Sequence, residues 1–78
     1  MTKKDNNITG KIGFKIKLLR KKINISQEEL GFRAGLNKNS IGSIERGESS
    51  PTIDTLNNIA EALETTIVDL VDISKIEL

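Results

Sequence analysis

Hydrophobic residues near the start of the 78-residue chain recur at intervals of four, three and four positions, at Ile12, Ile16, Leu19 and Ile23. This spacing places them on one face of an amphipathic helix, which we expect from about Gly10 to Ile23. Asn24 follows at a position suited to a left-handed residue that ends the helix. The polar residues 1–9 before it are expected to form a flexible N-terminal segment.

A second, shorter helix is predicted from a capping signal. Ser26 and Glu29 have the spacing of a capping box, in which the serine accepts a hydrogen bond from an amide three residues on and the glutamate reaches back. The helix should run to about Ala34 and end at Gly35, which tolerates a positive φ. Gly31 lies inside it at a cost of about 1 kcal/mol relative to alanine, which indicates a steric reason for a small residue there.

A third helix should begin at Asn37, a favourable N-cap, and end at Gly47. Its narrow apolar edge consists of Ile41 and Ile44. Two short helices joined by a tight turn at Gly35 form a helix-turn-helix, although an ordinary helical hairpin in a small bundle would give the same pattern.

Two more helices are predicted after the loop that contains Pro51. Thr52 is suited to cap one of them and Thr66 the other. Their apolar positions are Leu56, Ile59, Ala60 and Leu63 in the first, and Ile67, Leu70 and Val71 in the second. Five short helices without a credible strand predict an all-α fold, with residues 10–78 as a single domain.

The composition narrows the chemistry that the chain can perform. Hydrophobic residues make up 36% and charged residues 29%, as in a globular protein, and the chain has no Cys and no His. Disulfides, zinc fingers, thiol catalysis and histidine acid–base chemistry are therefore excluded, and we expect no metal or other cofactor. No apolar run approaches a membrane span and no signal peptide is evident, so a cytoplasmic protein is expected.

Charge is distributed unevenly along the chain. Residues 1–46 hold eleven basic and four acidic residues, a net charge of +7, whereas residues 47–78 hold one basic and seven acidic residues, a net charge of −6. A polyanionic partner on one side of the molecule would explain this distribution. Two solvated faces without a partner would explain it as well.

Several short motifs in the middle of the chain occur together, namely Gln27-Glu28-Glu29-Leu30, Gly35-Leu36, Ile41-Gly42-Ser43-Ile44-Glu45-Arg46-Gly47 and Pro51. With them the chain resembles the Cro/C1-type (Xre-like) helix-turn-helix transcriptional regulators over about residues 12–71. The resemblance implies a compact five-helix, lambda-repressor-like DNA-binding domain whose third helix enters the major groove of double-stranded DNA. The turn and third helix look close to those of restriction–modification controller proteins.

The resemblance also implies DNA-binding roles for six residues: Gln27, Asn37, Lys38, Asn39, Ser43 and Arg46. Lys38 and Asn39 would reach base edges, because lysine donates to guanine and asparagine can pair with adenine. Gln27 would contact a phosphate and brace the third helix. Asn37 would serve a phosphate, a cap or both, and Arg46 would contact DNA or be a surface charge.

Some positions depart from the family pattern. Position 31 is glycine where alanine is usual, and Asn24 and Glu64 stand where glycine is usual at helix ends. Glu48 is acidic in a loop that often carries basic phosphate contacts, which leaves Ser49 and Ser50 as the weaker candidates there. The resemblance further implies a structural ion pair between Arg20 and Glu45, expected near the domain surface.

The C-terminal segment is rich in apolar residues: Ile67, Val68, Leu70, Val71, Ile73, Ile76 and Leu78. A surplus of this kind often marks an interface, so we expect a homodimer that binds a palindromic operator. The same residues would otherwise complete the core of the monomer.

The predicted function is a sequence-specific DNA-binding transcriptional regulator, with no effector domain and no small-molecule effector expected. The alternative is an antitoxin whose main partner is a toxin protein. RNA binding fits less well, because the only aromatic residues, Phe14 and Phe32, suit the core better than base stacking. An enzyme fits least, because no cluster of carboxylates and hydroxyls indicates a substrate site.

Overall fold

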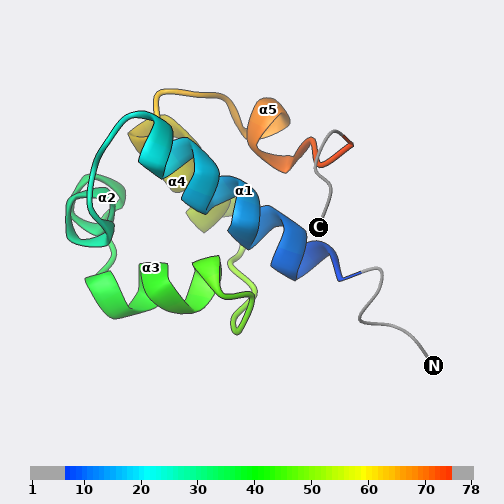
Figure 1. Cartoon of the computed structure of the whole chain (residues 1–78), viewed down its shortest axis with the longest axis horizontal. Coiled ribbons are helices and arrows are strands. Elements are labelled where there is room, and N and C mark those ends of the chain that lie inside the picture. Colours follow the sequence, from blue (N-terminus) through cyan, green and yellow to red (C-terminus); the bar gives the residue numbers. More distant parts are fainter. Residues whose placement is uncertain (1–6, 75–78) are drawn as a thin grey trace.

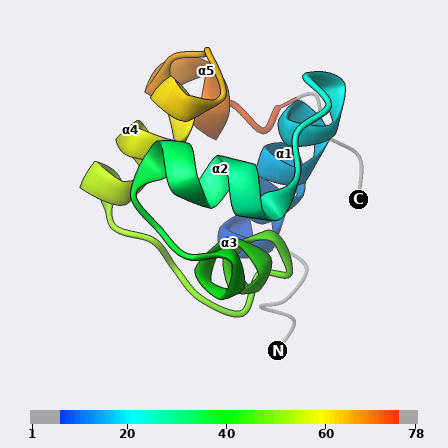
Figure 2. The same ribbon diagram turned by 90° about the vertical axis from the view of Figure 1, so that its left-hand side faces the viewer.

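The computed structural model describes residues 7–74, and within them it contains five helices and no strand (Figure 1). The helices are α1 (Ile8–Lys22), α2 (Gln27–Ala34), α3 (Lys38–Glu45), α4 (Ile53–Ala62) and α5 (Ile67–Val71). α3 packs against α1 and α2, whereas α5 packs against α1 and α4. Figure 2 shows α3 and α5 on opposite sides of the layer formed by the other helices, which confirms the predicted all-α fold. Among the described residues, no helix combines the length and the hydropathy needed to cross a bilayer.

Each helix begins with a polar side chain that accepts a hydrogen bond from the backbone N–H three residues later. These N-caps are Asn7, Ser26, Asn37, Thr52 and Thr66. Such caps satisfy backbone donors that have no partner within the helix. Four of the five were predicted at these residues.

The first cap and one capping box differ from the prediction. Asn7 accepts from the N–H of Gly10 at 3.0 Å, and α1 starts at Ile8. The expected flexible segment 1–9 was therefore predicted to end too late, because its residues 8 and 9 belong to the helix. Residues 1–6 of that segment lie outside the described residues. In the capping box predicted for α2, the serine part is present, because the Glu29 N–H donates to Ser26 at 2.9 Å. The Glu29 carboxylate turns instead to Arg33, whose Nε donates to it at 2.9 Å.

Four of the five helices, α1 to α4, end at or just before a residue with positive φ. Gly35 has φ of 77° and Gly47 has φ of 75°, as predicted for these two positions. Asn24 and Glu64 also have positive φ, of 59° and 64°, although both carry a side chain. The left-handed conformation is unfavourable for residues other than glycine, so these two helix ends store a little strain.

The core forms where the apolar stripes of the helices meet. Its largest fully buried side chains are Ile16, Leu30, Ile41, Ile59 and Leu70, one from each helix. The prediction that both phenylalanines belong to the core is wrong for Phe32, which is 82% exposed. Leu30 and Ala34 lie on the face of α2 that is buried against the core. Position 32, two residues from each of them, lies on the opposite, exposed face of the helix. Phe14 is half-buried.

The helix-turn-helix depends on a small residue at position 31. A Cβ atom placed on Gly31 would lie 2.5 Å from the carbonyl oxygen of Leu36 and 3.2 Å from the carbonyl carbon of Asn37. Both atoms belong to the backbone of the turn, which would have to move. The N–H of Leu36 also donates to the Gly31 carbonyl at 2.7 Å, so the turn lies directly on this residue. A side chain at position 31 would therefore force the backbone of the turn to shift.

Candidate nucleic-acid interface

One side of α3 is buried and the other is open to solvent. Ile41 and Ile44 are 0% and 5% exposed and anchor the helix on the core. Lys38 and Asn39 are exposed in the first turn, and Ser43 is half-buried one turn later. Residues four apart share a helix face, so Asn39 and Ser43 lie on the same side. The structure thus brings these two candidates together.

A shallow hollow lies between this side of α3 and the loop that leads to α4. Its lining includes Asn39, Ser43, Ser49 and Thr55. Ser49 was one of the weaker phosphate candidates, and the structure places it beside the residues expected to read bases. Ser50 points elsewhere, because its hydroxyl forms a 3.0 Å hydrogen bond with that of Thr9 at the start of α1. Sequence reasoning missed Thr9, since nothing local links two residues so far apart in the chain.

Asn37 serves as the N-cap of α3. Its Oδ1 atom accepts from the N–H of Ser40 at 2.8 Å, while the residue as a whole is exposed. The capping role, one of the two interpretations left open by the sequence, is therefore present. The N-terminal end of α3, with its amide groups, faces solvent beside the exposed Lys38. A helix N-terminus of this kind favours a nearby anion.

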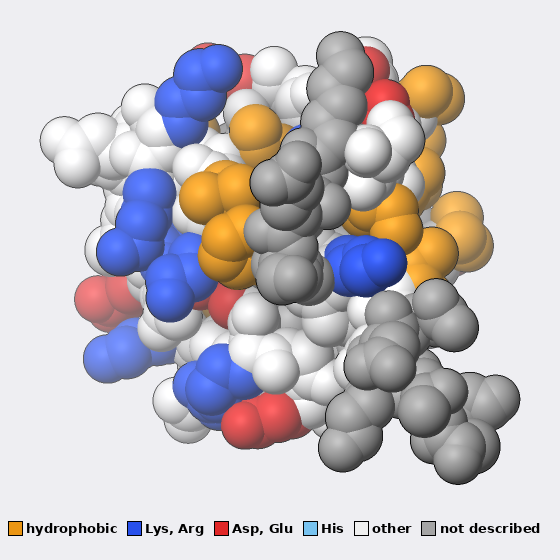
Figure 3. All heavy atoms as spheres, turned by 45° about the vertical axis from the view of Figure 1, so that its right-hand side comes forward, with side chains coloured by type: hydrophobic (Ala, Val, Ile, Leu, Met, Phe, Trp, Pro, Cys, Tyr) orange, Lys and Arg blue, Asp and Glu red, His pale blue; other side chains and the backbone are white. Residues whose placement is uncertain are grey.

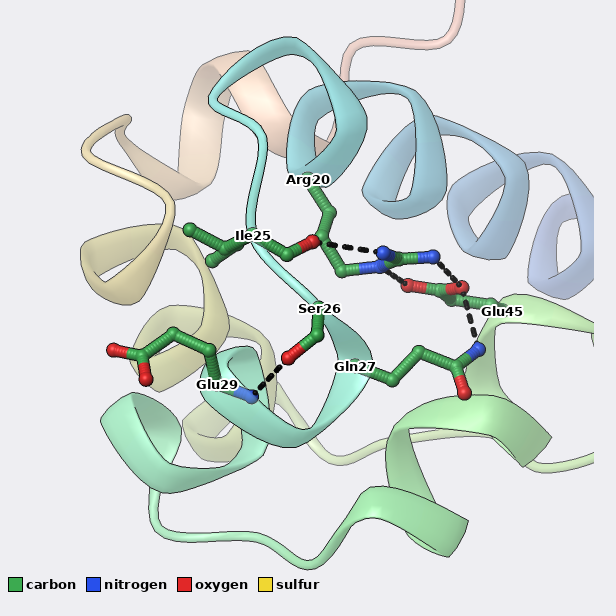
Figure 4. Close-up of polar contacts among 6 residues, drawn as sticks. All are labelled: Arg20, Ile25, Ser26, Gln27, Glu29 and Glu45. Carbon is green, nitrogen blue, oxygen red and sulfur yellow. Dashed lines mark hydrogen bonds and ion pairs between the residues drawn. The ribbon is translucent and has the colours of Figure 1, made fainter.

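Arg20, Gln27 and Glu45 form a hydrogen-bonded network that joins α1, α2 and α3 (Figure 4). Arg20 donates to the two carboxylate oxygens of Glu45, from Nε at 2.6 Å and from Nη2 at 3.0 Å. Gln27 donates from Nε2 to Glu45 at 3.0 Å. The third Arg20 donor, Nη1, reaches the carbonyl of Ile25 at 2.9 Å. The ion pair expected from the resemblance is confirmed, and so is the bracing role of Gln27.

The burial of this pair differs from the expectation. Arg20 and Glu45 are each only 8% exposed, so the pair does not lie at the domain surface as predicted. The sequence could not show this, because the packing of α1 and α2 over the end of α3 is what excludes water. Among the described residues, no buried side-chain nitrogen or oxygen atom lacks a hydrogen-bond partner. A satisfied network of this kind fixes the orientation of α3 relative to the other two helices.

Arg46 and Glu48 form a second pair, and this one is exposed. Arg46 donates from Nε to one Glu48 oxygen at 2.9 Å and from Nη2 to the other at 3.1 Å. The hydrogen bond and the charge of Glu48 raise the pKa of Arg46, and the hydrogen bond from Arg46 lowers the pKa of Glu48. Arg46 was predicted as a DNA contact, but its pairing with Glu48 was not foreseen.

Arg33, a further basic residue of α2, has a structural role. It pairs with Glu29 at 2.9 Å and lies 3.7 Å from the carboxylate of Glu64. Its Nη1 also donates to the carbonyl of Ala62 at 3.3 Å. These contacts tie the end of α2 to the end of α4, away from the exposed side of α3.

The opposite end of the molecule carries α5. Leu70 is fully buried, while Ile67 and Val71 pack partly buried against the core. These residues therefore complete the monomer core, which was the competing interpretation of the C-terminal apolar residues. Val68 is 72% exposed. Ile76 and Leu78 lie outside the described residues.

A lysine of α1 holds α5 in place. Lys15 donates from Nζ to the carbonyl oxygens of Asp69 and Asp72, each at 2.7 Å. A cation at this position also interacts favourably with the C-terminal end of the helix. Leu18, one turn further along α1, is 46% exposed. Figure 3 shows one face of the molecule, on which hydrophobic side chains gather in the upper and middle part, while most of the visible Lys and Arg side chains lie along its left side.

Comparison with known proteins agrees with this geometry. A family model described as Helix-turn-helix (HTH_3) matches residues 16–70. The control protein C.BamHI of Bacillus amyloliquefaciens is 38% identical over 72 residues, which cover 91% of this chain and 89% of the relative. The control protein C.SmaI of Serratia marcescens is 45% identical over 47 residues, or 60% of this chain and 56% of the relative.

A solved structure extends the similarity to three dimensions. The restriction–modification controller protein C.AhdI from Aeromonas hydrophila superposes with a TM-score of 0.78 at 31% identity. The superposition covers 80% of this chain and 94% of the controller protein. These comparisons give no support to the antitoxin alternative.

Proposed function

This chain belongs to the HTH_3 helix-turn-helix family and is a DNA-binding transcriptional regulator, and from this premise we propose that it is the controller protein of a restriction–modification system. The similarity to control proteins over most of the chain supports this role. In our proposal the protein acts in the cytoplasm as a homodimer without a small-molecule effector. It inserts α3 into the major groove of a palindromic operator.

The observation that carries the proposal is the two-sided character of α3. Its apolar side is locked onto the core by Ile41 and Ile44, and the buried network with Glu45 fixes its end. The side chains left on the outside are polar groups that can read base edges. We assign base contacts to Lys38, Asn39 and Ser43, because lysine, asparagine and serine side chains match the donors and acceptors of the major groove.

Phosphate contacts are assigned to residues that flank the base-reading side chains. Gln27 is half-buried, and its Nε2 donates one hydrogen bond to Glu45. A phosphate would therefore meet Gln27 through the one Nε2 hydrogen that Glu45 leaves over, or through the backbone amides at the start of α2. Asn37 and Arg46 are exposed at the two ends of α3 and complete this set.

Subunit pairing is assigned to the face formed by α5 and the adjoining part of α1. Val68 and Leu18 are its exposed apolar side chains, on elements that Lys15 ties together. This face lies away from α3, so a dimer formed there leaves both copies of α3 accessible. In a two-fold complex the two copies of α3 should lie about 34 Å apart, one turn of DNA.

The test is the affinity of the chain for a panel of duplexes that differ from a selected operator by one base pair each. Asn39→Ala should lose about 1–3 kcal/mol on the preferred operator and relax the preference at one base position. Gln27→Ala should weaken binding to all duplexes evenly, because phosphates carry no sequence information. Asn58→Ala, at an exposed position on α4, is the matched control and should change neither the affinity for DNA nor the preference among the duplexes.

The rank order of the operator variants decides the outcome. If Asn39→Ala lowers every affinity by the same factor and leaves that order untouched, Asn39 does not read a base. If the wild-type chain selects no sequence from random duplexes, the proposed regulatory role is wrong.

A further inference from the structure

The exposed pair of Arg46 and Glu48 lies at the edge of the proposed DNA-binding surface. Arg46 is the C-cap of α3, and Glu48 follows in the loop toward α4. Both oxygens of the Glu48 carboxylate accept from the guanidinium, at 2.9 and 3.1 Å. Two parallel N–H···O bonds are also the way in which arginine binds a phosphate group. The carboxylate therefore occupies the donors that a DNA phosphate would use.

The position of the guanidinium strengthens this interpretation. A Cβ atom placed on Gly42 would lie 3.0 Å from Nη1 of Arg46 and 3.6 Å from Oε1 of Gln27. The Arg46 guanidinium thus lies over Gly42 of α3, on the same side as Gln27, while its side chain stays more than half exposed. Arg46 and Gln27, two of the side chains assigned to phosphates, therefore lie close together near Gly42, and Glu48 is the anion that Arg46 already binds there.

The pairing has a cost for DNA binding. Arg46 can bind a phosphate only if it leaves Glu48, and the released carboxylate then lies near the negatively charged DNA backbone. Either the arginine contact is lost or its gain is offset by this repulsion, so one counterion fewer is released on binding. The effect is independent of sequence, because it concerns only phosphates.

We propose that Glu48 is an internal competitor of DNA phosphate for Arg46, and that it lowers the affinity of the chain for double-stranded DNA of every sequence. The inference rests on the proposed DNA-binding function and adds to it a residue that sets the level of non-specific binding. Both side chains are more than half exposed, so the pair can open without any change in the fold.

The experiment measures the affinity of the wild-type chain, Glu48→Gln, Arg46→Ala and the double variant for two duplexes, the selected operator and an unrelated sequence. Glu48→Gln should raise both affinities by a similar factor, about five- to tenfold near 0.1 M salt. For Glu48→Gln, the slope of log affinity against log salt concentration should be steeper than that of the wild type by about 0.9. In the Arg46→Ala background, Glu48→Gln should raise both affinities by a clearly smaller factor, because only the repulsion between the carboxylate and the DNA backbone is removed.

Glu61→Gln is the matched control, because it removes one exposed carboxylate from α4, at the hollow next to Phe32 and away from α3. It should change either affinity less than twofold. Thermal unfolding of each variant verifies that the fold is intact.

The double variant separates two explanations of a gain in affinity. If Glu48→Gln strengthens binding equally with and without Arg46, Glu48 acts only as a repulsive charge and the competition is refuted. If the wild-type chain binds DNA and Glu48→Gln binds no better, the inference alone is wrong. A wild-type chain that binds neither duplex overturns the proposed function, and the inference falls with it.

Discussion

The pair of Arg20 and Glu45 should be energetically coupled far more strongly than an ordinary surface ion pair. Removing either partner leaves the other charge inside the protein without its main partner, at a cost of about 3–5 kcal/mol. The whole domain is expected to be stable by only about 4–12 kcal/mol at this length. Arg20→Met and Glu45→Met should therefore each bring the protein close to unfolding.

The double variant should recover most of this loss. Two methionines of similar volume leave no unpaired charge, and such apolar replacements are often neutral. The Ile25 carbonyl and the Gln27 amide would still lose one hydrogen bond each, at about 1 kcal/mol apiece. We therefore expect the double variant to be about 1–3 kcal/mol less stable than the wild type, with a coupling energy of at least about 3 kcal/mol.

Urea unfolding followed by far-UV circular dichroism at neutral pH measures these free energies. Arg33 and Glu29 provide the control cycle, because their pair is exposed on one helix and should couple by less than about 1 kcal/mol. Single-variant losses at Arg20 and Glu45 that simply add, with a coupling as small as that of the control, would refute the reasoning from burial.

Three further results are expected. Gly31→Ala should lose about 1–2 kcal/mol in urea unfolding, because the clash with the Leu36 carbonyl outweighs the gain in helix propensity; a more stable variant would contradict the steric argument. Glu64→Gly should gain about 0.5–1 kcal/mol in the same assay by relieving a positive φ, and an unchanged midpoint would show that the helix end is not strained. Val68→Asp should shift the sedimentation equilibrium toward monomer while the helical circular dichroism stays unchanged; an unaffected dimer would exclude this face of α5.

Local rules predicted the elements because the signals for helix ends are themselves local. Ser26, Asn37, Thr52 and Thr66 cap the helices as expected, since a cap involves residues only three positions apart. The steric need for Gly31 was likewise visible as a costly residue inside a helix. Asn7 was missed because the helix was predicted to start at Gly10, although Ile8 lies four residues before Ile12 and is in register with the apolar stripe.

The errors concern contacts between distant segments. Phe32 was assigned to the core by its hydrophobicity alone, whereas the crossing of α2 over α3 and α4 decides which face is buried. The depth of the pair formed by Arg20 and Glu45 depends in the same way on how three helices converge. Among the candidate site residues, the arrangement of Asn39 and Ser43 followed from helical spacing, but the capture of Arg46 by Glu48 required side-chain geometry.

The separation of α3 from α5 bears on how such a regulator diversifies. The main helix contacts of α3 are with α1 and α2, and those of α5 are with α1 and α4. A substitution at Val68 therefore leaves Asn39 and its surroundings unchanged, and the reverse is also true. In the proposed dimer, operator choice and the choice of pairing partner are therefore two traits that mutation can alter one at a time. Two descendants of one ancestral copy in the same cell could stop forming mixed dimers while still recognising the same operator half-site.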